Sequence, residues 1–155
     1  MPCQARHGLS AYLDGRCSAP QGAKMFLSQL KYNQKKCFLS LANYLLNIDG
    51  EFDEFESDYL RAICVEMSLS NGDIEPFTLD SVTQKFPEQE ARKILLTESM
   101  DLALCNEEYD QSEKLFIEDL VKKLNLISDL AEIKNMVETH FKNQKNLISY
   151  IFSEE

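Results

Sequence analysis

The chain has 155 residues, of which 44% are hydrophobic and 27% charged, the composition of one ordinary globular domain. Its formal net charge of −10 repels nucleic-acid phosphates and anionic lipid, so we expect no direct nucleic-acid binding and no membrane insertion. No apolar run approaches the ~20 residues that cross a bilayer, and no segment resembles a secretory signal. Five scattered cysteines without CxxC spacing argue against a disulfide framework and predict a cytoplasmic protein.

Residues 1–23 contain several glycines and a proline without sustained periodicity, which predicts a loose N-terminal arm before one helical domain over residues 24–155. The first long helical pattern runs from Phe26 to Ile48 and is expected to stop at Gly50. A second helix is expected from about Asp53 to Ser68.

The second half of the chain continues the helical pattern after a loop at residues 70–76. A short helix with Thr78 as its cap precedes a helix that begins at Pro87. Three further helices are predicted over about 110–125, 129–141 and 147–152. Since no segment alternates like a strand, the sequence predicts an all-α fold of about seven helices.

Two short acidic segments look like copies of each other. The first is Asp49-Gly-Glu-Phe-Asp-Glu-Phe-Glu56 and the second is Asn106-Glu-Glu-Tyr-Asp-Gln-Ser-Glu113. They are 57 residues apart (108 − 51), and apolar residues downstream match at the same offset with helical spacing. The repeated unit is an acidic turn followed by an amphipathic helix, which predicts two related halves.

Each acidic turn has a purely structural interpretation. Asp53 with Glu56, and Asp110 with Glu113, have the spacing of a capping box, in which the first residue accepts from backbone amides and the glutamate reaches back. Acids at a helix start also complement the helix dipole, by about 0.3–1 kcal/mol each. These four residues therefore need no further function.

The remaining acids are harder to explain, because Asp49 ends a helix, where the dipole disfavours an anion, and residues 49–58 include no base. Oxygen ligands at this density suit a hard cation such as Ca²⁺ or Mg²⁺. An EF-hand does not fit, since Glu54 stands at its glycine position and Leu60 at its final glutamate. The candidate metal ligands are Asp49, Glu51, Asp53 and Glu56 in the first turn, and Asn106, Glu108, Asp110 and Glu113 in the second.

The segment Leu41-Ala-Asn-Tyr-Leu-Leu-Asn-Ile-Asp-Gly-Glu-Phe-Asp-Glu-Phe-Glu56, followed by a helix that ends at Met67-Ser-Leu69, resembles the TerB-like family of tellurite-resistance proteins. The resemblance covers roughly residues 24–141. It implies an all-α fold with pseudo-twofold halves, an acidic surface suspected of divalent-metal binding, and no established enzymatic activity. The second copy departs from the family motif, because Asn106-Glu107 replaces Asp-Gly.

The favoured function is an acidic binding or sensing module in a stress-response context that holds a divalent cation, and not an enzyme. The alternative is a metal-free interaction module that docks a basic partner protein on its acidic face. A third possibility, a hydrolase with paired carboxylates, would need a cleft that raises the pKa of one carboxyl.

Overall fold

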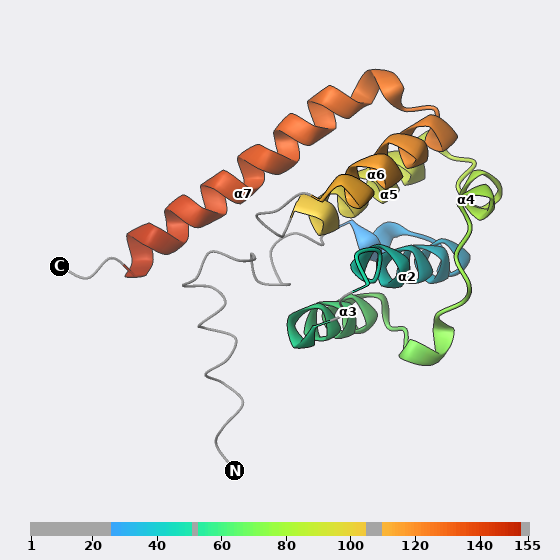
Figure 1. Ribbon diagram of the computed structural model, residues 1–155, viewed down its shortest axis with the longest axis horizontal. Helices are drawn as coiled ribbons and strands as arrows, with labels where there is room; N and C mark the ends of the chain where they lie inside the picture. The colour runs from blue at the N-terminus through green and yellow to red at the C-terminus, as the bar shows by residue number, and fades with distance from the viewer. Residues whose placement is uncertain (1–25, 51–52, 105–109, 153–155) are drawn as a thin grey trace, which may run out of the picture.

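The computed structural model describes residues 26–50, 53–104 and 110–152, and throughout these ranges the regular structure is helical, without strands (Figure 1). The all-α prediction is thus confirmed. The α-helices are α2 (Tyr32–Leu46), α3 (Glu54–Met67), α4 (Leu79–Lys85), α5 (Gln89–Leu104), α6 (Gln111–Leu124) and α7 (Leu130–Phe152). Short 3₁₀ helices are η1 (Leu27–Gln29), η2 (Asn71–Asp73) and η3 (Ile127–Asp129).

The first predicted helix is divided in two. After η1, Leu30 and Lys31 are extended, and α2 begins only at Tyr32. The Gln34 side chain explains this start, because its Oε1 accepts the Lys31 N–H at 3.0 Å and so caps the new helix. At the other end α2 stops at Leu46, so Gly50 lies in the turn that follows the helix instead of capping it.

The last two predicted helices form the single helix α7. Its sequence contains neither glycine nor proline, so nothing breaks the backbone between the two apolar stripes. Ile133 and Val137 are buried near its start, whereas its final turns leave four large apolar side chains between 51% and 83% exposed: Leu147, Tyr150, Ile151 and Phe152.

Two helices form the centre of the bundle. Helix α2 packs against α3, α4 and α5, and α5 packs in turn against α6 and α7 (Figure 1). Phe38, Leu41 and Leu95 are among the fully buried side chains that these helices contribute to the core. Cys37 and Cys64 are buried free thiols that pack like small apolar residues, while Cys105 lies outside the described residues.

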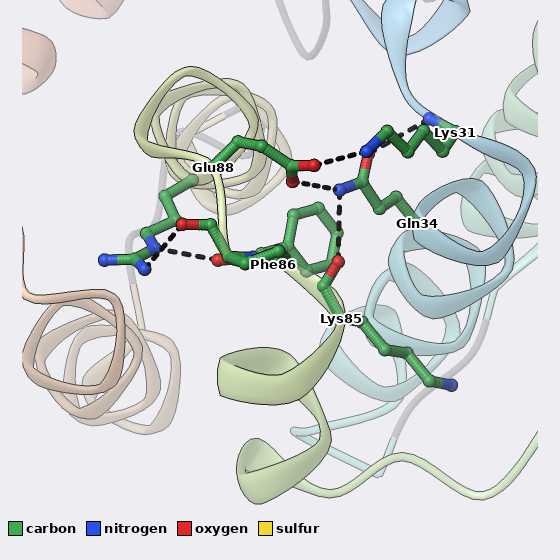
Figure 2. A network of polar contacts seen from close by, with 7 residues as sticks. Lys31, Gln34, Lys85, Phe86 and Glu88 are labelled. Atoms are coloured by element: carbon green, nitrogen blue, oxygen red, sulfur yellow. Dashed lines mark hydrogen bonds and ion pairs between the residues drawn. The ribbon is translucent and has the colours of Figure 1, made fainter.

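A buried amide fixes the junction between α4 and α5 (Figure 2). The Gln34 Nε2 donates to the Lys85 carbonyl at 3.0 Å and to the Glu88 carboxylate at 2.9 Å. Arg92 closes the junction from the other side, where its Nε donates to the Phe86 carbonyl at 2.7 Å. Because Gln34 is only 4% exposed, these bonds satisfy an amide that would otherwise be costly to bury.

The sequence repeat is also a repeat of local structure. Helices α3 and α6 both have 14 residues and begin 57 residues apart (111 − 54). Each starts after an aspartate N-cap, Asp53 or Asp110, and each ends at a left-handed residue, Ser68 (φ 56°) or Asn125 (φ 55°). Helices α2 and α5 also begin 57 residues apart (89 − 32). The matching sequence positions therefore have matching backbone structure.

Candidate acidic site

The first acidic turn joins α2 to α3. The Gly50 N–H donates to the Asn47 carbonyl at 3.0 Å, and Gly50 has a φ of +83°, a conformation that favours glycine. Asp49 lies on this turn with its side chain exposed. Glu51, the next predicted ligand, falls outside the described residues, so the turn presents Asp49 and the cap residue Asp53.

The two predicted capping boxes are both confirmed. The Asp53 carboxylate accepts the Glu56 N–H at 2.8 Å, and the Asp53 N–H donates to the Glu56 carboxylate at 2.9 Å. At the second turn the Asp110 carboxylate accepts the Ser112 N–H at 3.2 Å, and the Asp110 N–H donates to Glu113 at 3.0 Å. The aspartates are exposed and the glutamates buried, so each turn places one carboxyl in water and one inside.

Glu113 carries the clearest electrostatic signal at this site. The pKa of its carboxyl is raised to about 7, chiefly by burial and also by the negative charges of Asp110, Asp49 and Glu56, against the lowering effect of the Asp110 N–H bond. Asp49 and Glu56 belong to the first turn, so the charges of the two turns act on each other. Asp110 behaves oppositely, because backbone N–H groups of Gln111 and Ser112 lower its pKa.

The eight predicted metal ligands are not all placed. Asn106 and Glu108, like Glu51, lie outside the described residues. Within the ranges that the structure describes, no three or more His, Cys, Asp or Glu side chains are grouped so as to hold a metal ion. The donor chemistry, carboxylates only, fits a hard cation such as Ca²⁺ or Mg²⁺. The described residues thus supply suitable donors without completing a ligand set.

Two buried acids on α5 escaped the sequence analysis. Glu98 is fully buried and Asp101 is 4% exposed, and the Tyr59 hydroxyl donates to Asp101 at 3.0 Å. The sequence of α5 contained an indication that these acids are buried. Leu95, Leu96 and other apolar residues cover most faces of the helix, which leaves no wide polar face for an acid. Buried acids of this kind are expensive and need internal partners, as Asp101 has in Tyr59.

No family model, no curated protein and no solved structure matches this chain. Across the described part of the chain, none of the helices combines the length and the apolar character that a bilayer crossing requires.

Proposed function

We propose that this protein is an acidic binding module of the TerB-like type whose two turns together bind one hard divalent cation, Ca²⁺ or Mg²⁺. The observation that carries the proposal is the meeting of charges from both turns at the buried carboxyl of Glu113. Asp49 and Glu56 act on Glu113 from the other turn, and Asp110 acts on it from its own turn. A divalent cation would offset this repulsion and would bind only the folded protein.

We also propose that the two halves are related by a pseudo-twofold axis, as in the TerB-like family. A residue near such an axis contacts its own equivalent, 57 positions away. Lys31 forms an ion pair with Glu88, which is its equivalent (88 − 31 = 57), and both belong to the network in Figure 2. Glu56 and Glu113 are also equivalents, and the charge of one acts on the other.

A reciprocal pair of contacts gives further support to the axis. Contacts across a twofold axis occur in pairs. If residue A contacts the equivalent of residue B, then residue B contacts the equivalent of residue A. Tyr59 bonds to Asp101, the equivalent of Tyr44, at 3.0 Å. Tyr44 in turn packs on Phe116, the equivalent of Tyr59, with ring centroids 5.4 Å apart. Both contacts join the half that contains α2 and α3 to the half that contains α5 and α6.

The site favours binding over catalysis. A carboxyl with a pKa of about 7 could serve as a general acid or base, but it must reach a substrate. The Glu113 side chain is 9% exposed and accepts the Asp110 N–H at 3.0 Å, so a capping box occupies it. We therefore propose a module that is not an enzyme. The proposed stress-response context rests on the resemblance to the TerB-like family, and the proposed cytoplasmic location rests on the scattered cysteines without CxxC spacing.

Calorimetric titration with Ca²⁺, Mg²⁺ and Mn²⁺ tests the proposal. We expect saturable heat for the parent, and weaker binding for Asp53→Asn, which keeps a capping oxygen but loses a ligand charge. Asp119→Asn is the matched control, because Asp119 is exposed on α6 and forms an ion pair with Lys122 at 3.2 Å. Absence of binding heat with all three cations, or equal weakening by both variants, would contradict the cation site.

The alternative function is a metal-free module that docks a basic partner. It is favoured by the exposed carboxylates of Asp49, Asp53, Glu54 and Asp58, which follow one another along the first turn and the start of α3. Such a partner would bind in the presence of chelator, and its affinity would fall steeply with salt. A cation-dependent complex with weak salt dependence would instead favour the cation site.

A further inference from the structure

A groove lies beside the first acidic turn, between the end of α2 and the extended segment 74–78. Its volume is about 340 Å³, near the lower end of the ~300–1,000 Å³ range of ligand sites, so it fits a short segment and not a large cofactor. Its lining residues are Ser40, Asn43, Tyr44, Asn47, Ile48, Glu75, Pro76 and Phe77.

Aromatic rings from the two sides of the groove contact each other. The Tyr44 ring packs on Phe77 with centroids 5.6 Å apart and on Phe116 at 5.4 Å, and Phe77 meets Phe116 at 6.0 Å. Phe116 is buried and packs against the other two rings, while Tyr44 is 45% exposed. Pro76 also lines the groove, so a packed cluster of tilted aromatic rings and a proline borders it.

The α2 side of the groove also carries side-chain amides. Asn43 and Asn47 line the groove one helical turn apart, and the Asn47 Nδ2 donates to the Asn43 backbone carbonyl at 2.6 Å. Each side-chain amide offers both a donor and an acceptor, the same pair of groups that a peptide bond offers. Ser40 fixes the width of the groove, because its Oγ accepts the Glu75 N–H at 2.9 Å.

The charges around the groove are balanced. The Glu75 carboxylate pairs with Lys36 at 2.7 Å and with Lys85 at 3.9 Å, and the Lys36 bond lowers the pKa of Glu75. A ligand therefore gains little from charge inside the groove. Asn47 and Ile48, which line the groove, precede Asp49 directly in the chain, so the groove adjoins the acidic turn.

We infer that this groove is a docking site for an extended peptide that places a proline on Tyr44 and Phe77 and a basic residue beside Asp49. Aromatic grooves recognise proline because the polyproline II conformation is preformed and loses little entropy on binding. The two asparagine amides suit the exposed backbone of such a peptide, which has no internal hydrogen bonds. The expectation of a basic residue in the peptide depends on the proposed function of the acidic turn, whereas the expected proline contact does not.

Nuclear magnetic resonance titration of the full chain in chelator tests the inference. The probes are acetylated and amidated Arg-Pro-Leu-Pro, Gly-Pro-Leu-Pro and Arg-Gly-Ser-Gly peptides. We expect the first to shift the amide resonances of Asn43, Asn47 and Phe77 and to bind more tightly than the other two. Asn43→Ala should weaken this binding about 2- to 10-fold, the effect of one lost hydrogen bond. Asn143→Ala, at an exposed position on α7, should leave it unchanged.

The outcomes separate the groove from the acidic turn. Failure of both proline peptides to shift these resonances, or equal effects of the two asparagine variants, would overturn the groove. Equal affinity for Arg-Pro-Leu-Pro and Gly-Pro-Leu-Pro would overturn the basic end alone and would count against the basic-partner function. Since the titration is run in chelator, none of these results depends on whether the turns bind a cation.

Discussion

Replacing Glu113 by glutamine should stabilise the protein at pH 8 and have little effect at pH 4.5. The Glu113 carboxyl is buried among the carboxylates of Asp110, Asp49 and Glu56, and its pKa is raised from 4.5 to about 7. Glutamine has nearly the same shape, carries no charge, and can still accept the Asp110 N–H through its Oε1. The substitution thus removes the charge while it keeps the capping box.

The sign follows from the two protonation states. Between pH 4.5 and about 7 the folded protein holds a proton on Glu113 that the unfolded chain has already lost, so the free energy of unfolding falls as the pH rises. Below pH 4.5 Glu113 is protonated in both the folded and the unfolded state, and its contribution to the free energy of unfolding is fully present. Above pH 7 Glu113 is ionised in both states, and this contribution is lost. At about 1.4 kcal/mol per pH unit, ionisation of Glu113 lowers the free energy of unfolding by at most about 3 kcal/mol. Relaxation of the protein around the charge reduces this loss to about 1–3 kcal/mol.

Urea unfolding of the parent and Glu113→Gln at pH 5, 6, 7 and 8, in chelator, measures this difference. The advantage of the variant should grow across the series and level off near pH 8. Glu118→Gln, a change at an exposed position on the same helix, provides the control. Its free energy of unfolding should change with pH in the same way as that of the parent. If the Glu113→Gln curve also runs parallel to the parent curve, then the carboxyl is not held protonated and the reasoning from burial and repulsion is refuted.

Three further substitutions test the local structure, each by chemical unfolding in chelator. Asp53→Asn should change stability by only a few tenths of a kcal/mol, whereas Asp53→Ala should cost about 1 kcal/mol, because asparagine caps a helix and alanine does not; equal losses would refute the cap. Gly50→Ala should cost about 1–2 kcal/mol because of the positive φ, and Gly72→Ala, where a Cβ meets only the Ser70 Oγ at 3.5 Å, should cost less; the reverse order would contradict the turn. Gln34→Ala should cost about 1–3 kcal/mol through its lost bonds to Lys85 and Glu88, and Gln84→Ala, on the exposed face of α4, should cost little; similar losses would disprove the role of the buried amide.

Local chemistry was predictable from the sequence because it depends on near neighbours. The spacing of Asp53 to Glu56 and of Asp110 to Glu113 predicted both capping boxes, since each box needs only residues within one turn of helix. The 57-residue offset likewise predicted the matched ends of α3 and α6. Even so, the break at Leu30 and Lys31 was missed, because it depends on a side-chain cap from Gln34 and not on a glycine or proline.

Long-range chemistry was less predictable. Glu98 and Asp101 were not singled out by the sequence analysis, and their burial follows from how α2, α6 and α7 pack around α5. The groove beside Asn43 and Phe77 combines a helix with a loop, and these two residues are 34 positions apart in the chain (77 − 43), a juxtaposition that only the fold creates. The effect of Asp49 on the pKa of Glu113 also depends on how the helices pack. The sequence repeat indicated two similar turns, but it did not show that their charges lie close enough to interact.

The most direct test of a shared cation site is the rise in unfolding midpoint that millimolar Ca²⁺ or Mg²⁺ causes in four proteins, each compared with chelator. The proteins are the parent, Asp49→Asn in the first turn, Glu113→Gln in the second, and the double variant. One shared site predicts that cation stabilises the parent, that either single substitution removes most of this gain, and that the double variant loses little more. Independent losses that add in the double variant would mean two separate sites, and a parent midpoint that neither cation raises would contradict cation binding altogether.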